Sequence, residues 1–345
     1  MTPLPPSLSI AKTPTPLERM DRLSDELGLE LWVKRDDLTG SHLSGNKVRK
    51  LDFLLAAAKN QGATTVITCG GIQSNHARAT ALAARPLGLK AHLLLRTPNG
   101  LATELPDPPT GNVLLDLLAG ATLHTISPAD YRAARNERMA ALADMLREAG
   151  EVPAIIPEGG SSALGALGYV QCAREIAHQL AAHGLEADVV AAATGSGGTL
   201  AGLAVGFEDL GTKTQALGLA VCDDAAWFSA IVERLANDAR THYGLPALSA
   251  KRYEVEDRFV GRGYALTTPA ELAHLASVVR DHGLALDPVY TNKAFLGLVS
   301  RLREAPQSSA AGHPKVVVFI HTGGLFGLFG HRFTPDELAA LDARA

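Results

Sequence analysis

The sequence predicts an α/β protein whose parallel, twisted sheets are flanked by helices. Short apolar segments rich in β-branched residues alternate with helical segments along much of the chain. Residues 187–193, ADVVAAA, are apolar almost throughout, as expected for a strand with both faces buried. Glycine-rich loops follow three predicted strands, where open α/β sheets bind their ligands. With 345 residues, 46% of them hydrophobic, the chain can bury a core as two lobes or one large domain.

The predicted elements follow in regular order. Alternating apolar residues predict a strand at 29–34, and an apolar stripe predicts a helix at 46–60 with Ser44 or Asn46 as its N-cap. The pattern continues with strands at 64–68, 91–95, 122–126, 153–156, 187–193 and 315–320, and helices at 74–84, 112–118, 128–149 and 163–181. The proline-rich first twenty residues and the loop at 106–109 are expected on the surface. The segment DPVYTNK at 287–293 is expected to join a short strand to a helix.

Composition excludes several classes of protein. A net charge of −4 argues against a nucleic-acid or membrane-surface partner, because such partners usually need a basic face. The three cysteines lie far apart without CxxC spacing, which excludes a disulfide scaffold or a cysteine-rich zinc site and favours the reducing cytoplasm. The first residues carry no apolar signal-peptide region, and no apolar run is long enough for a membrane span. No metal site is predicted.

Three loops at strand ends combine glycine with polar side chains: CGGIQSNH at 69–76, TGSGGT at 194–199 and HTGG at 321–324. In the second loop, glycines allow backbone N–H groups to turn inward at a helix N-terminus, which suits a phosphate. A tight structural turn is the alternative. The loop lacks the Gly-Lys-Ser/Thr of a Walker motif, and Leu200 replaces the third glycine of a dinucleotide motif, so a single phosphate fits best.

The segment SGNKVRK at 44–50 places Lys47 and Lys50 on one face of a helix. Two close ammonium groups indicate an anion site, a reactive amine, or both, whereas a capped helix with solvated lysines is the simpler interpretation. Ser74 is a natural N-cap that could instead help to hold a carboxylate. Tyr290 could equally be a packed core residue.

These segments resemble pyridoxal-phosphate enzymes of the tryptophan-synthase-β fold type, specifically the 1-aminocyclopropane-1-carboxylate deaminase and D-cysteine desulfhydrase group. The resemblance covers nearly the whole chain, through LWVKRDDLTG, SGNKVRKLDFLL, CGGIQSNHARATA, PEGGSSALGALGYV, ATGSGGTLAG, LDPVYTNKA and IHTGG, in the order of the family. Ser44 and Asn292 stand where the family pattern often has glycine. The resemblance implies a two-lobed fold with the cofactor between the lobes.

The resemblance also implies roles for individual residues around pyridoxal 5′-phosphate. Lys47 would bind the cofactor aldehyde as a Schiff base, Asn46 would bond its 3′-oxygen, and Lys50 would neutralise its phosphate beside the loop amides. The implied cofactor-binding residues are Asn46, Lys47, Lys50, Thr194, Gly195, Ser196, Gly197, Gly198, Thr199, Thr291 and Thr322.

A small amino-acid substrate would lie against a second set of residues. Ser74 and Asn75 would bind its carboxylate, with His76, Tyr264 and Tyr290 also placed at the substrate. The implied catalytic residues are Lys47, Ser74 and Tyr290.

Two threonines favour one activity within the group. Its deaminases resemble one another in having Glu after the DPVY tyrosine and Leu within H-x-G-G, where this chain has Thr291 and Thr322. A carboxylate at the ring nitrogen makes a strong electron sink, useful for opening a cyclopropane, whereas a hydroxyl suffices for losing a good leaving group. This implies α,β-elimination by a carbon–sulfur lyase, with D-cysteine giving pyruvate, ammonia and hydrogen sulfide.

Several alternatives stay open at this point. The chain could open 1-aminocyclopropane-1-carboxylate, eliminate from cysteate or chloroalanine, or bind a metabolite as a sensor without turnover. More remotely, Ser44-x-x-Lys47, Tyr290-x-Asn292 and His321-Thr-Gly323 resemble the motifs of serine β-lactamases and penicillin-binding proteins, although their spacing is wrong for that fold.

The resemblance further implies the organisation of the whole molecule. Residues 1–50 and 165–345 would form a larger cofactor-binding lobe, and residues 51–164 a smaller lobe that closes over the substrate. A homodimer is expected on the same ground.

Overall fold

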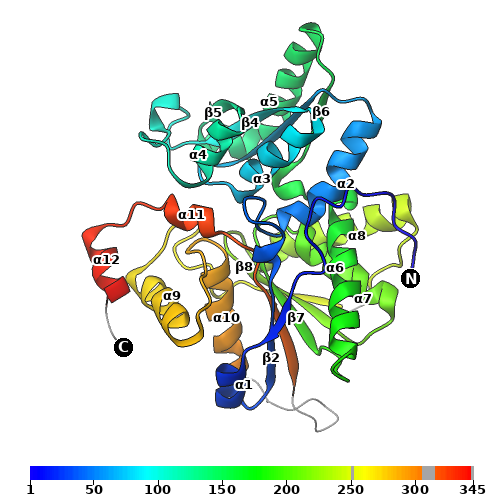
Figure 1. Cartoon of the computed structure of the whole chain (residues 1–345), viewed down its shortest axis with the longest axis vertical. Helices are drawn as coiled ribbons and strands as arrows, with labels where there is room; N and C mark the ends of the chain where they lie inside the picture. Colours follow the sequence, from blue (N-terminus) through cyan, green and yellow to red (C-terminus); the bar gives the residue numbers. More distant parts are fainter. Residues whose placement is uncertain (250–251, 305–314, 343–345) are drawn as a thin grey trace.

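The chain folds into two lobes, each built on its own sheet (Figure 1). The structure, a computed structural model, describes residues 1–249, 252–304 and 315–342. Every strand pair is parallel except β1 with β2. The predicted α/β class, with parallel sheets flanked by helices, is therefore confirmed.

The six-stranded sheet has the order β1-β2-β10-β7-β8-β9. Helices α1, α9 and α10 pack on one face, and α6, α7 and α8 pack on the other. Successive residues of β7 alternate between these two cores, which explains why its sequence is apolar throughout. The strands are β1 (Leu17–Arg19), β2 (Glu30–Lys34), β7 (Val189–Thr194), β8 (Gln215–Ala220), β9 (Tyr253–Glu256) and β10 (Val316–Ile320), and the helices are α1 (Asp21–Leu27), α6 (Ala163–Ala181), α7 (Gly198–Leu210), α8 (Ala225–Tyr243), α9 (Pro269–His282) and α10 (Thr291–Glu304).

The four-stranded sheet has the order β5-β4-β3-β6 and forms the upper lobe in Figure 1. Helices α2 and α3 bury one face of it, and α5 buries the other. The strands are β3 (Thr65–Gly71), β4 (Lys90–Arg96), β5 (Thr122–Ile126) and β6 (Pro153–Ile155), and the helices are α2 (Lys47–Asn60), α3 (Asn75–Ala84), α4 (Gly111–Leu118) and α5 (Pro128–Glu148). Two further helices, α11 (Leu325–Phe329) and α12 (Pro335–Asp342), follow β10.

Helix α2 joins the two lobes. Its Val48, Leu51 and Leu55 belong to the core of the smaller sheet, whereas Phe53 packs with residues of α6 and α7. All four strands of the smaller sheet fall within residues 51–164, but α2 itself runs across position 51. The lobe boundaries at 51 and 164, and closure of the smaller lobe, remain predictions.

The N-terminal segment lies over the surface, as predicted, with only Ala11 and Thr15 buried among its first twenty residues. It is anchored there because the Ile10 and Ala11 amides donate to the Asp52 carboxylate of α2. Residues 17–19 then pair with β2 as a short strand. The prolines exclude long regular structure here without preventing the segment from packing against α2.

The strand predicted ahead of Asp287 is wrong. The backbone at 283–286 forms no strand, and Leu284 and Leu286 instead bury their side chains in the core on one face of the large sheet. A segment that lies over a face of a sheet cannot pair with it, because only an edge strand has unpaired backbone groups. This segment therefore fills the core without forming a strand. The elements β8, α8, β9 and α9 occupy residues 215–282, for which no element was predicted.

Candidate active site

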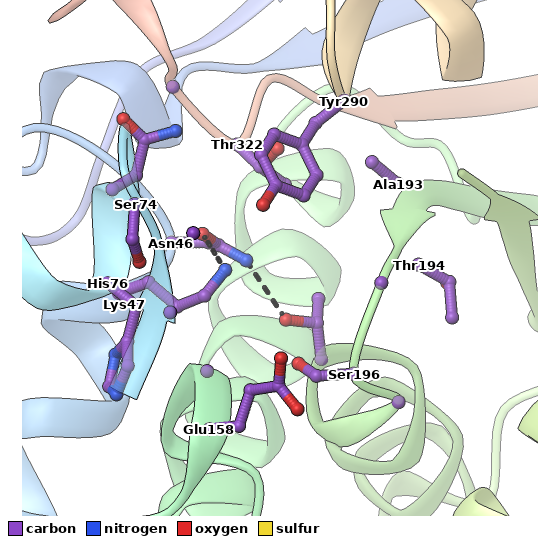
Figure 2. A pocket seen from close by; sticks show the side chains of 18 of the residues that line it. Asn46, Lys47, Ser74, His76, Glu158, Ala193, Thr194, Ser196, Tyr290 and Thr322 are labelled. Carbon is purple, nitrogen blue, oxygen red and sulfur yellow. Dashed lines mark hydrogen bonds between the residues drawn. The ribbon is translucent and has the colours of Figure 1, made fainter. Parts of the chain in front are cut away.

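The functional residues gather in a cleft between the two lobes (Figure 2). Strands β7 and β10 are neighbours in the large sheet, so the loops that follow them meet at one edge. The loop after β3 faces them from the smaller lobe. The cleft is lined by Asn46, Lys47, Cys69, Gly70, Gly71, Ser74, Asn75, His76, Glu158, Gly159, Ala193, Thr194, Gly195, Ser196, Gly197, Thr199, Leu200, Tyr264, Tyr290, Thr322 and Gly323.

Lys47, the first residue of α2, points its amine into this cleft (Figure 2). Its Nζ donates to Asn46 Oδ1 at 3.0 Å, and Asn46 Nδ2 donates to Thr199 Oγ1 at 3.1 Å. Burial lowers the pKa of Lys47 to about 8, although the charge of Asp287 opposes the shift. About a tenth of the amine is therefore a free base at pH 7, far more than for an ordinary lysine. Asn46 does not cap the helix as predicted, because its side chain is engaged in these two bonds.

Lys50 lies beneath the glycine loop that begins α7 and does not line the cleft. Its Nζ donates to the Gly159 carbonyl at 3.1 Å and lies 3.5 Å from Ser161 Oγ, both neutral groups. Burial, with repulsion from Lys47, holds the pKa of Lys50 well below its ordinary value. No carboxylate forms an ion pair with this amine in the described part of the chain, so an anion bound at the loop would favour its charged form.

The loop at 194–199 has the shape of an anion cradle. Gly197 adopts a left-handed φ of 78°, and the Gly198 amide donates to Ser161 Oγ at 3.2 Å. A methyl group on Gly198 would lie 2.6 Å from Ser161 Oγ and 3.0 Å from Lys50 Nζ. A side chain at this position would therefore displace Ser161 or Lys50 from the N-terminus of α7, where the backbone, a hydroxyl and an amine converge.

Ser74 and Asn75 lie at the start of α3, across the cleft from the glycine loop. Ser74 caps the helix as predicted, with its Oγ accepting from the Ala77 amide at 3.1 Å. Asn75 Oδ1 accepts from Asn112 Nδ2 at 3.0 Å, which fixes the orientation of its amide. Both residues line the cleft at the positive end of a helix dipole, which suits a carboxylate.

Tyr264 and Tyr290 form a pair over the cleft. Their hydroxyls are 2.5 Å apart and their rings meet edge to face, with centroids separated by 5.8 Å. Lys47 Nζ lies 6.0 Å from the centroid of the Tyr290 ring. Burial raises the pKa of both phenols, so both stay protonated at neutral pH.

The two threonines at the ends of their motifs have different surroundings. Thr322 lines the cleft, whereas Thr291 is fully buried outside it. The Thr291 hydroxyl donates to Asp287 Oδ1 at 2.7 Å and accepts from the Asp287 amide at 2.7 Å. The structure brings only one of the two predicted ring-contacting hydroxyls to the cleft.

Two other predicted residues direct their side chains toward neighbouring strands. His76 turns its ring to β3, where Nε2 lies 2.8 Å from Thr68 Oγ1, and burial lowers its pKa far below the ordinary value. The Thr194 hydroxyl points toward β8, since a methyl group on Gly218 would lie 2.7 Å from it. Ser44 does not line the cleft, so the motifs that resemble serine acyl-transferases do not assemble there.

Glu158 also lines the cleft, although no role was predicted for it. Its carboxylate accepts from Tyr131 Oη at 2.7 Å and lies 3.3 Å from Arg135 Nε, so α5 of the smaller lobe holds it in place. The PEGG motif after β6 was the available signal, because it is another glycine-rich loop at a strand end. The pairing with Tyr131 could not be read from the sequence.

The cleft fits pyridoxal phosphate by its own chemistry. It presents an amine of lowered pKa and, one helical turn away, a glycine cradle backed by an unpaired buried ammonium. The residues that would hold the phosphate are Lys50, Ser161, Ser196 and the amides of 195–199. Within the described ranges, no group of three or more His, Cys, Asp or Glu side chains could hold a metal ion, and no helix is long and apolar enough to cross a membrane.

Comparison with known proteins agrees with this chemistry. Residues 8–323 match the family model described as "Pyridoxal-phosphate dependent enzyme". The chain is 42% identical to a bifunctional D-cysteine desulfhydrase/1-aminocyclopropane-1-carboxylate deaminase of Arabidopsis thaliana, a mitochondrial protein, over 99% of this chain and 83% of that one. It is 40% identical to a D-cysteine desulfhydrase of Yersinia enterocolitica, over 94% and 96% of the two chains.

Among solved structures, the crystal structure of an ACC deaminase homologue superposes with a TM-score of 0.83. The two chains are 34% identical, and the match covers 97% of this chain and 96% of the other. A match across nearly all of both chains shows that the overall fold is shared. The protein therefore belongs to the family of pyridoxal-phosphate-dependent enzymes, with pyridoxal phosphate as its cofactor.

Proposed function

We propose that this protein catalyses α,β-elimination from a small β-substituted amino acid, with D-cysteine as the substrate. One D-cysteine and one water give one pyruvate, one ammonia and one hydrogen sulfide. The observation that carries the proposal is the amine of Lys47, with its lowered pKa, facing a helix N-terminus and a tyrosine pair across one cleft. Its relatives named D-cysteine desulfhydrase support the choice of substrate.

Each part of the cleft takes one task. Pyridoxal phosphate supplies an electrophilic aldehyde and a ring that stabilises negative charge at the substrate Cα. Ser74 and Asn75 hold the substrate carboxylate at the positive end of α3. Lys47 removes the α-proton as a general base, for which a pKa of about 8 is well matched to neutral pH.

The tyrosine pair serves the leaving group. In a pair of hydroxyls 2.5 Å apart, one proton lies between the two oxygens and the other is free to be donated. Because burial keeps both Tyr264 and Tyr290 protonated, the free proton can pass to the sulfur as the Cβ–S bond breaks. Thr322, a neutral hydroxyl, supports elimination of a good leaving group over opening of a carbon ring.

A panel of substrates tests the proposal. D-cysteine, L-cysteine, 1-aminocyclopropane-1-carboxylate, cysteate and chloroalanine are assayed for pyruvate, 2-oxobutyrate, sulfide and sulfite. We expect pyruvate and sulfide in equal amounts from D-cysteine, and none from Lys47→Ala. Cofactor binding without any product would favour a sensor, and an active Lys47→Ala protein would overturn the role of the amine.

Cyclopropane opening is the second candidate. The bifunctional Arabidopsis relative and the ACC deaminase homologue favour it. In the same panel it predicts 2-oxobutyrate from 1-aminocyclopropane-1-carboxylate with a kcat/KM above that for D-cysteine.

We also propose a homodimer in the cytoplasm. The three cysteines are free, which suits a reducing compartment. Leu117, Leu118 and Phe329 are exposed on α4 and α11, two helices that contact each other, and support a protein interface there. Light scattering after gel filtration should give about twice the chain mass of 36.2 kDa, and cell fractionation tests the compartment.

A further inference from the structure

The loop at 260–266, between β9 and α9, carries Tyr264 into the cleft. Its backbone is irregular: Gly261, Gly263 and Ala265 all have left-handed φ values, of 63°, 112° and 58°. For Ala265 this conformation is unfavourable, because its Cβ crowds the backbone there. Something outside the loop must therefore stabilise its shape.

The hydrogen bonds within this loop are long. The Val260 amide reaches the Asp257 carbonyl at 3.4 Å, the Gly263 amide reaches the Val260 carbonyl at 3.3 Å, and the Leu266 amide reaches the Gly263 carbonyl at 3.3 Å. Ordinary N–H···O bonds cluster near 2.9–3.0 Å. The loop's own backbone contacts thus hold it weakly.

The side chain of Lys293 fills the centre of the loop. This residue lies in the first turn of α10, is almost fully buried, and donates from Nζ to the carbonyls of Val260 at 2.8 Å, Gly263 at 2.8 Å and Leu266 at 3.0 Å. An ammonium has three N–H donors, and all three are used. The Glu271 carboxylate lies 3.8 Å away and supplies counter-charge.

We propose that Lys293 is a positioning residue: its ammonium gathers three carbonyls of the loop and so fixes Tyr264 against Tyr290. The 2.5 Å contact between the two hydroxyls needs the loop and the start of α10 to keep one relative position. Lys293 lies three residues after Tyr290 in the sequence, so its bonds to the loop connect the loop to the segment that carries Tyr290. The inference rests on the proposed function only for the statement that Tyr264 faces the substrate.

Loop order can be tested without any substrate, because Arg262 is exposed and offers a trypsin site inside the loop. In Lys293→Met, whose side chain keeps the volume but not the charge, we expect cleavage after Arg262 to be about tenfold faster or more, since local opening exposes the peptide. Arg234, exposed on α8, is the internal control for global unfolding. An unchanged rate at Arg262, or an equal increase at Arg234, would overturn the proposal.

Chemical rescue tests the ammonium itself. Lys293→Ala leaves a space beside three carbonyls, so ammonium or methylammonium chloride should restore protection of Arg262, while sodium chloride at equal ionic strength should not. Lys293→Met, in which the space is filled, should not respond. Rescue of Lys293→Met, or no rescue of Lys293→Ala, would show that charge at this position does not order the loop.

Kinetics then connect the loop to Tyr264. For a substrate turned over in the panel above, Lys293→Met should lower kcat/KM about 10- to 100-fold, the range expected when a catalytic group is displaced by about 1 Å. Adding Lys293→Met to Tyr264→Phe should cost little more, because both changes remove one function. Additive losses would contradict the proposal that Lys293 acts through Tyr264. The trypsin assay uses no substrate, so its result would stand even if D-cysteine were not the substrate.

Discussion

At the scale of single residues, the two lysines of α2 have separate surroundings although they lie one turn apart. Lys47 faces the open cleft beside Asn46, while Lys50 lies under the glycine loop with only neutral partners. Each lies in a poorly solvated site, and the charge of Lys47 further lowers the pKa of Lys50. A bound phosphate would offset the charge of Lys50 and leave Lys47 for covalent chemistry.

The pKa of Lys47 predicts how cofactor binding depends on pH. Only the neutral amine attacks an aldehyde, and a group with a pKa of about 8 is about 10% neutral at pH 7 and about 90% at pH 9. The rate constant for covalent binding of pyridoxal phosphate to apoprotein, followed by visible absorbance, should rise about tenfold between these values and then level off. A rise of about 100-fold without a plateau would indicate an ordinary lysine. Lys59→Ala, an exposed lysine of α2, is the control.

We expect substitution of Thr291 to affect mainly stability, and substitution of Thr322 to affect mainly activity. Thr291→Val removes a buried hydroxyl bonded to Asp287 and should lower the free energy of unfolding by about 1–3 kcal/mol, with little change in kcat of the folded fraction. Thr322→Val, at the cleft, should lower kcat for D-cysteine about tenfold with a smaller effect on unfolding. Urea unfolding and steady-state kinetics check both, and equal effects of the two changes on kcat would contradict this division.

At the scale of elements, the N-terminus of α3 combines a structural task with a binding task. Ser74 accepts from Ala77 to cap the helix, and its position at the cleft also presents it to a ligand. Capping and ligand binding are therefore not alternatives here, because an orphan helix N-terminus needs a cap and also attracts an anion.

A matched pair of caps tests this double task. Ser74→Ala and Ser127→Ala, which removes the cap of α5, should each lower stability by about 1 kcal/mol. Only Ser74→Ala should raise KM for D-cysteine, by about tenfold or more. If KM stays unchanged in Ser74→Ala, the hydroxyl acts in capping alone.

At the scale of the whole molecule, a buried ionic network ties α2 to the larger lobe. Arg49 donates to both Asp36 carboxylate oxygens, at 2.8 and 2.9 Å, and to Glu175 at 3.0 Å. Tyr169 donates to Asp36 at 2.6 Å. Burial alone would raise the pKa of Asp36, but Arg49 and these hydrogen bonds hold it below its ordinary value. The network thereby fixes the helix that carries Lys47.

The direction of that shift predicts how stability depends on pH. A carboxylate whose folded pKa is depressed contributes stability above its unfolded pKa of about 4, and the contribution is lost as pH falls through the folded value. Asp36→Asn should therefore lower the free energy of unfolding by about 3–5 kcal/mol between pH 5 and 8, and by less below about pH 4. Urea unfolding across this range measures the difference. A difference that narrows between pH 8 and pH 5 would contradict the assignment, and Asp21→Asn, in an exposed ion pair, is the control.

The α/β class, most strand and helix positions and the motifs that resemble the family could be predicted from the sequence, since hydrophobic period and turn residues are local properties. Which of those residues share the cleft depends on how the chain packs in three dimensions. That packing placed Thr322 in the cleft and Thr291 outside, turned His76 toward β3, added Glu158, and centred Lys293 in the loop of Tyr264. The physical reason is that a side chain's direction and partners depend on contacts between segments far apart in the chain, which no local pattern records.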